Sequence, residues 1–179
     1  MKHAICFSFF VLAITSCSSK RHSFNSKEDL KALKIELQKV LGDQEFTSLG
    51  ISADNMTGLV NGAQLYYDKG DKKYFLSYDF SLKKLAKPKE FSSIIGKEKP
   101  FKIADISLVD VLEKYNVAGG NLNSKNEYEY MALKNIDFQS VKGKLDLEFT
   151  IQASKPADRR IYYEINCKLV NDKPECKAK

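Results

Sequence analysis

The first regular pattern along the chain is a stripe of apolar residues at helical spacing, formed by Leu30, Leu33, Leu37, Val40 and Leu41. Lysines fall largely outside the stripe, which is typical of an amphipathic helix with one face on a core. Ser26 precedes the pattern and Asp29 follows it by three residues, as at a helix N-cap, and Gly42 suits a helix end. The pattern predicts a helix that begins after Ser26 and ends at Gly42.

Strand-like alternation follows in residues 59–82, which are rich in Tyr and Phe. The sequence Asp68-Lys69-Gly70-Asp71 in their middle is typical of a turn, so these residues are predicted to form a hairpin. Helical spacing returns from Ile106 to Asn116, and Gly119-Gly120 is expected to end that helix. Three further strands are predicted near residues 128–138, 145–151 and 161–169.

Two helices interleaved with strands predict an α+β fold. We expect an antiparallel sheet of about five strands with two helices packed on one face. Apolar residues make up 43% of the 179-residue chain and no linker divides it, so one core and one domain are expected. The halves echo each other in their order of elements, but their residues match poorly and no sequence repeat is inferred.

The N-terminus is hydrophobic without any periodicity. Lys2 precedes an apolar run of 11 residues from Ala4 to Ile14, interrupted only by Ser8. As a helix this run would span about 16 Å, roughly half of a ~30 Å hydrocarbon core. A basic residue before a short apolar run is typical of a signal peptide rather than of a membrane span. We therefore expect residues 1–16 to be removed.

The apolar run ends in Ile14-Thr15-Ser16-Cys17, followed by Ser18. This sequence resembles the lipobox of bacterial lipoproteins, in which an aliphatic residue and two small residues precede the lipidated cysteine. Thr and Ser stand where smaller residues are commonest in that family. The resemblance is confined to the N-terminus and implies that Cys17 becomes the first residue, with diacylglycerol on its thiol.

The resemblance also implies where the mature protein lies. Acyl chains on Cys17 would hold it in a membrane leaflet almost permanently. Ser18 is similar to the residue found in lipoproteins sorted to the outer membrane, so in a host with two membranes we expect an outer-membrane protein that faces the periplasm. The alternative is secretion without lipid, after cleavage at Ser18 or Ser19. Residues 17–26 are expected to be a tether, and residues 27–179 a single domain with a short polar C-terminal tail.

Two cysteines remain beyond the signal peptide and the lipidated position, namely Cys167 and Cys176. An even pair in an exported domain is typical of a disulfide, because the compartment is oxidising. A bridge would close a loop of about ten residues and contribute about 2–3 kcal/mol. The alternative is a buried Cys167 with a free Cys176 thiol. No metal site is expected, because two cysteines without a nearby histidine supply too few ligands.

Positive charge is concentrated in one segment. The chain carries a net charge of +6, and residues 69–102 hold ten lysines against four acidic residues. Such a segment suits an anionic partner: lipid headgroups, a cell-wall polymer or an acidic protein. The alternative is a solvated surface, which the excess of Lys over Arg favours. No nucleic acid is expected as a partner in an exported compartment. The candidate residues are Lys69, Lys72, Lys73, Lys83, Lys84, Lys87 and Lys89.

Catalytic chemistry has few candidates in the sequence. His22 falls in the expected tether, so His-based triads and His-ligated metals are not expected in the core. No nucleotide-binding or nucleophile-elbow motif occurs. Asp146 and Glu148 share a strand face about 7 Å apart, and so do Glu127 and Glu129. A glycosidase pair could use that spacing, but alternating charge on the solvent face of a strand is far commoner. We expect no enzyme and no cofactor.

These observations favour a lipid-anchored, non-catalytic protein of the cell envelope that binds an envelope component or serves as an accessory subunit. The alternatives are a binder of a small lipid or peptide, and an inhibitor or immunity protein against a secreted enzyme. A deep apolar pocket would favour the ligand binder, whereas a flat Lys and Tyr surface around residues 66–102 would favour a partner surface. Tyr162 and one of Tyr66 and Tyr67 are expected to face outward.

Overall fold

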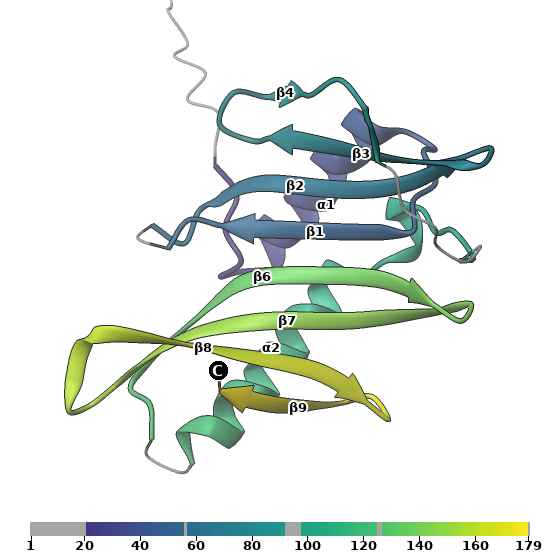
Figure 1. Ribbon diagram of the computed structural model, residues 1–179. Coiled ribbons are helices and arrows are strands. Elements are labelled where there is room, and N and C mark those ends of the chain that lie inside the picture. Colours follow the sequence, from purple (N-terminus) through teal and green to yellow (C-terminus); the bar gives the residue numbers. More distant parts are fainter. Residues whose placement is uncertain (1–20, 56, 92–97, 125–126, 179) are drawn as a thin grey trace, which may run out of the picture.

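The computed structural model describes residues 21–55, 57–91, 98–124 and 127–178. Within these residues, two α-helices and nine strands form two layers, with both helices on one face of a single antiparallel sheet (Figure 1). The predicted α+β class is therefore confirmed. The sheet is larger than the five or so strands that the sequence predicted.

Each helix is followed by an antiparallel meander, and the two meanders meet at the centre of the sheet. The first half contains α1 (Lys27–Leu41), β1 (Ser48–Ala53), β2 (Val60–Lys69), β3 (Lys72–Asp79), β4 (Lys84–Leu85) and β5 (Lys89–Phe91). The second contains the 3-10 turn η1 (Ile103–Asp105), α2 (Leu108–Asn123), β6 (Tyr130–Val141), β7 (Lys144–Lys155), β8 (Asp158–Val170) and β9 (Lys173–Ala178). The same order of elements thus occurs twice, although the residues do not match.

The strand order is β4-β3-β2-β1-β6-β7-β8-β9, and β5 also pairs with β3. The antiparallel β1–β6 ladder therefore joins the two halves, with Leu49 opposite Phe138 and Ile51 opposite Ile136. All four side chains are buried. The strands β4 and β9 lie at opposite edges of the sheet, as Figure 1 shows.

The first helix begins and ends where the sequence predicted. The Ser26 side chain accepts a hydrogen bond of 3.0 Å from the Asp29 backbone N–H. Gly42 adopts a φ of +57° and its N–H donates to the Gln38 carbonyl. Only glycine takes such a left-handed conformation without strain, so the residue that follows Leu41 is well suited to stop the helix.

The second helix is longer than predicted, because Gly119-Gly120 does not end it. Ser107 caps its N-terminus and the helix continues to Asn123. Ala118 and Gly119 are buried, and Leu122 packs against the core. This packing outweighs the cost of about 1 kcal/mol that a glycine imposes on a helix.

The five predicted strands correspond to β2, β3, β6, β7 and β8, and the predicted turn at Asp68–Asp71 joins β2 to β3. The sequence analysis missed the other four. β1 contains a glycine and only three apolar residues, Leu49, Ile51 and Ala53, while β9 is polar and contains Pro174. β4 and β5 are too short to show a period.

The folded domain begins earlier than expected, so the predicted tether of residues 17–26 is wrong in its second half. His22, Ser23 and Phe24 are all buried, and Phe24 is only 1% exposed. The Val60 N–H donates to the His22 carbonyl at 2.9 Å, and Ser23 bridges to Leu59. The Phe24 ring and these backbone pairs attach the segment to the start of β2.

Candidate functional site

A hydrogen-bonded network fastens the N-terminal segment to the domain. The His22 Nε2–H donates to Glu36 Oε2 at 2.8 Å, and the Tyr78 hydroxyl donates to Glu36 Oε1 at 2.8 Å. These residues come from the N-terminal segment, α1 and β3. His22 falls in the expected tether and lies far along the chain from Glu36 and Tyr78, so no local spacing predicts this network.

The electrostatics of the network follow from its burial and its hydrogen bonds. Burial alone would raise the pKa of Glu36, but hydrogen bonds from His22 and Tyr78 outweigh it and lower that pKa below its ordinary value. The nearby charge of Lys83 acts in the same direction. Burial and the Glu36 carboxylate raise the pKa of Tyr78 to about 12. The network holds an ionised Glu36 at neutral pH; it presents no nucleophile, and its evident role is to fix the junction of the N-terminal segment.

The predicted lysine candidates fall into two groups, one at the β2–β3 hairpin and one in the segment that contains β4 and β5. Lys69, Lys72 and Lys73 lie at the β2–β3 hairpin, where Lys72 Nζ contacts Glu90 Oε2 at 2.9 Å and Lys73 Nζ lies 4.0 Å from Asp68 Oδ1. Acidic neighbours therefore offset much of the charge at this hairpin.

Lys83, Lys84, Lys87 and Lys89 are exposed along the other side of β3, in the segment that contains β4 and β5. This segment is an edge of the sheet, where Lys and Pro discourage pairing with the strands of another molecule. Pro88 lies in the same segment, and Lys173, Pro174 and Lys177 repeat the pattern on β9 at the opposite edge. Protection of the edge thus explains part of the lysine enrichment without a ligand.

An aromatic cluster occupies the face of the sheet that the helices leave open. Tyr66 lies opposite Phe75 in the β2–β3 ladder, with ring centroids 5.2 Å apart, and the Phe91 ring is 6.0 Å from Tyr66. The neighbouring residues Leu65 and Leu76 are buried on the helix side, so the alternation of strand side chains directs these rings to the open side. We call Tyr66, Phe75 and Phe91 the aromatic patch.

Two lysines border the aromatic patch on the same face. Lys73 pairs with Phe91 and Lys89 with Phe75 across the β3–β5 ladder, and directly opposed residues point to the same face of a sheet. Tyr67 instead packs against the core, and Tyr162 is 59% exposed. The prediction that Tyr162 and one of Tyr66 and Tyr67 face outward is therefore confirmed.

Of the carboxylates considered as catalytic candidates, Asp146 and Glu148 lie on β7, as predicted. Glu127 and Glu129 precede β6, so the prediction that they share a strand face is wrong. Glu148 contacts Lys168 Nζ at 2.9 Å, and both side chains are more than half exposed. Asp137 lies opposite Glu148 in the β6–β7 ladder, and desolvation together with the charge of Glu148 raises the pKa of Asp137. Glu127 and Glu129 are exposed. This arrangement resembles a charged sheet surface more than an acid–base pair.

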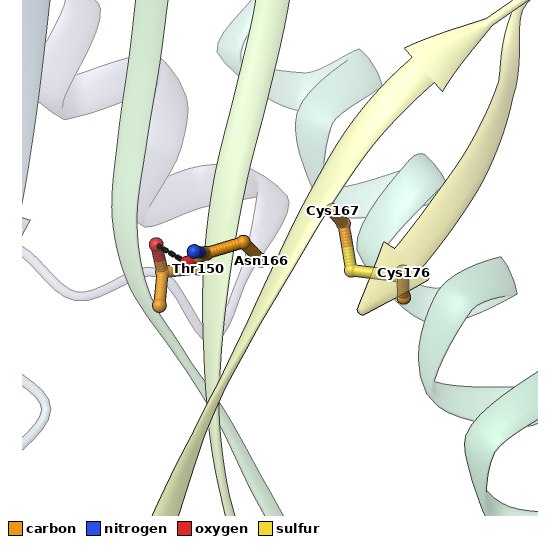
Figure 2. The surroundings of a disulfide bond; sticks show 4 residues. All are labelled: Thr150, Asn166, Cys167 and Cys176. Atoms are coloured by element: carbon orange, nitrogen blue, oxygen red, sulfur yellow. Dashed lines mark hydrogen bonds between the residues drawn. A yellow bond between two sulfur atoms is a disulfide. The ribbon is translucent and has the colours of Figure 1, made fainter. Parts of the chain in front are cut away.

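The predicted disulfide between Cys167 and Cys176 is present. These residues lie directly opposite each other in the β8–β9 ladder, with Cα atoms 4.1 Å apart (Figure 2). Figure 2 also shows the Thr150 hydroxyl donating to Asn166 Oδ1 on the neighbouring strands. Cys167 is 1% exposed, so the disulfide ties the edge strand β9 to the core.

A small open pocket lies beside this disulfide, between α2 and β9. It is lined by Ala118, Asn121, Leu122, Pro174 and Cys176 and holds about 110 Å³. Small-molecule sites commonly enclose about 300–1,000 Å³. This pocket is therefore too small for a lipid or a peptide.

Some predicted features lie outside the described residues, namely the lipobox residues Ile14, Thr15 and Ser16 and the lipidation candidate Cys17. Among the residues that are described, no helix is long and apolar enough to cross a membrane. Nor does the described part of the chain contain a group of three or more His, Cys, Asp or Glu side chains that could hold a metal ion.

No protein-family model and no curated protein matches the chain. Among solved structures, the fold is similar to the crystal structure of a putative lipoprotein from Clostridium difficile 630, with a TM-score of 0.43 and 11% sequence identity. The similarity covers 89% of this chain and 100% of that one. At this level of similarity the comparison does not bear on function.

Proposed function

We propose that the chain is a lipid-anchored, non-catalytic protein of the cell envelope, and that its domain binds a partner molecule through the open face of the sheet. The anchor is Cys17, on the strength of the lipobox resemblance. In a host with two membranes, Ser18 favours the outer membrane, with the domain in the periplasm. The partner is an envelope component, either a protein or an anionic polymer.

The aromatic patch is the observation that carries this proposal. Tyr66, Phe75 and Phe91 lie together on a sheet face that no described helix covers, and Phe91 is 48% exposed. Large rings contribute much of the energy of binding interfaces, and the exposed Lys89 beside them adds attraction for an acidic partner. An exposed surface of Tyr, Phe and Lys side chains supports a partner surface rather than a ligand pocket.

The alternative of a small-ligand binder has less support. The apolar side chains between helices and sheet form one continuous buried cluster. The pocket beside α2 and β9 is too small for such a ligand. An inhibitor or immunity protein is a special case of the proposal, in which the partner is a secreted enzyme.

Crosslinking in intact cells tests the proposal. A tagged full-length chain would be compared with Phe91→Ala combined with Lys89→Glu. A matched control, Val117→Ala combined with Lys31→Glu, removes equivalent groups from the helix side, where Val117 is 53% exposed. We expect the parent and the control to capture one partner in stoichiometric amount, and the patch variant to lose it.

Equal capture by the patch variant and the parent would contradict binding at the open face. The identity of the partner separates the remaining alternatives. A secreted enzyme that is inhibited on binding would indicate the inhibitor role, and a glycan or lipid without protein would indicate an anionic polymer as the partner.

A further inference from the structure

The N-terminal segment enters the domain at one defined place. Figure 1 shows the start of the described chain beside the end of β3 that leads to β4. His22 is held there by Glu36, and its ring lies 6.0 Å from the ring of Phe80. Only four residues lie between Cys17 and His22, so five Cα–Cα steps join them. Even fully extended, they reach about 17 Å.

A lipid on Cys17 would therefore keep this end of the domain close to the membrane surface. The connection from β3 to β4, residues 80–83, begins beside this junction, because the Phe80 ring lies against the ring of His22. Phe80 is buried against Tyr78 as well as His22. These contacts hold the start of the connection beside His22, where the described part of the chain begins.

The β3–β4 connection is also locally rigid. Asp79 Oδ1 accepts hydrogen bonds from the Ser81 N–H at 2.8 Å, the Ser81 hydroxyl at 2.6 Å and the Leu82 N–H at 3.0 Å. These bonds define the turn and direct the Leu82 side chain outward, where it is 71% exposed. Leu82 is thus an apolar side chain that a well-ordered turn presents to solvent.

The surroundings of Leu82 are basic. Lys83 and Lys84 follow it directly and are exposed, and Leu85 is 41% exposed. Arg21 is exposed at the point where the N-terminal segment enters. Exposed leucines among basic residues are the composition of surfaces that bind membranes, where apolar groups enter the interface and basic groups meet anionic headgroups.

We infer that the β3–β4 connection is a membrane-contact element, in which Leu82 enters the interface of an anionic lipid bilayer while Arg21, Lys83 and Lys84 bind its headgroups. The inference rests on the proposed lipid anchor and adds the orientation of the domain to it. The β4 edge then faces the bilayer, while the β9 edge points away. Lys83 and Lys84 then bind lipid headgroups in addition to protecting the edge of the sheet.

Binding to lipid vesicles tests the inference without the covalent anchor. The mature chain carrying Cys17→Ser would be mixed with phosphatidylcholine vesicles, either pure or with phosphatidylglycerol, and bound protein measured by sedimentation. The variants are Leu82→Asp and the double change Lys83→Glu with Lys84→Glu. The matched control is Lys173→Glu with Lys177→Glu. It has the same net charge as the double variant at Lys83 and Lys84, but its changes lie on the opposite edge of the sheet.

We expect the parent to bind the anionic vesicles and to bind more weakly as salt is raised. The double change at Lys83 and Lys84 should weaken binding at least about tenfold, because two attractive charges become repulsive. Leu82→Asp should also weaken it, and the β9 control should stay within about twofold of the parent. Absence of binding by the parent, or equal losses in the test and control variants, would overturn the inference.

Incorporation of labelled palmitate into the wild-type chain, with Cys17→Ser as control, tests the anchor separately. Palmitate incorporation without vesicle binding would leave the anchor and remove the membrane-contact element. Vesicle binding without palmitate incorporation would support the contact element and remove the proposed anchor.

Discussion

Replacement of Phe24 by alanine tests whether the N-terminal segment belongs to the folded domain. The sequence assigns residue 24 to a tether, where a substitution would cost almost nothing. In the structure the ring is 1% exposed and part of the hydrophobic core. The two interpretations therefore differ by several kcal/mol for one substitution.

The magnitude follows from the buried area. A phenylalanine side chain buries about 150–250 Å², and at about 25 cal/mol per Å² this amounts to about 4–6 kcal/mol. Alanine retains part of that area, and measured Phe→Ala substitutions in cores cost about 3–5 kcal/mol. If the segment detaches instead of leaving a cavity, the loss also includes the hydrogen bond between the Val60 N–H and the His22 carbonyl.

Urea unfolding of the mature Cys17→Ser chain, followed by circular dichroism at neutral pH, measures this loss. For a domain of this size we expect the midpoint to fall by about 1.5–2.5 M at an unchanged slope. Phe91→Ala is the matched control and should cost about 1 kcal/mol or less, because that ring is 48% exposed. A Phe24→Ala midpoint no lower than that of the control would refute the packed segment and restore the tether.

Two further predictions concern the disulfide and the Glu36 network. Cys176→Ala should lower the free energy of unfolding by about 2–3 kcal/mol, since the bridge to Cys167 closes a loop of about ten residues. A reductant should destabilise the parent by a similar amount and leave the variant unchanged. A parent whose stability does not change on complete reduction would contradict the prediction. Because its hydrogen bonds lower the folded-state pKa of Glu36, its contribution to stability is present above the ordinary value of 4.5 and is lost as the pH falls through the folded-state pKa. In Glu36→Gln the urea midpoint should therefore fall less steeply between about pH 5 and pH 3 than it does in the parent. The exposed control Glu45→Gln should show the same pH profile as the parent. Identical profiles for the two variants would refute the contribution of Glu36 to stability.

Features that depend on neighbouring residues could be predicted from the sequence. The first helix follows from its leucine stripe with Ser26 and Gly42 at its ends, and the β2–β3 hairpin from alternation around a turn in which Gly70 adopts a φ of +65°. The disulfide between Cys167 and Cys176 followed from a count of cysteines in a chain that its N-terminus predicts to be exported. Each of these rests on spacing within a few residues or on composition.

Features that depend on pairing between distant segments could not be predicted from the sequence. β1 is a strand because its backbone lies between β2 and β6, and β9 because it pairs with β8, where the disulfide holds it. The three apolar residues of β1 alternate with Ser48, Gly50 and Ser52 over only six residues, and β9 has too few apolar residues to show a period. The extension of α2 past Gly119-Gly120 likewise depends on packing that only the folded chain provides.

Local patterns in the sequence predict the class of fold, both ends of the first helix and five of the strands, because periodicity and turn chemistry act over short stretches of chain. Only the tertiary structure decided that His22 meets Glu36 and Tyr78, that Tyr66, Phe75 and Phe91 share the open face, and that Leu82 lies beside the N-terminal junction. Strand register sets which face a side chain occupies, and a shift of one residue would reverse it. Register is decided by the packing of the core around each strand, so the surface formed by β2, β3 and β5 follows from the folded sheet and not from local spacing.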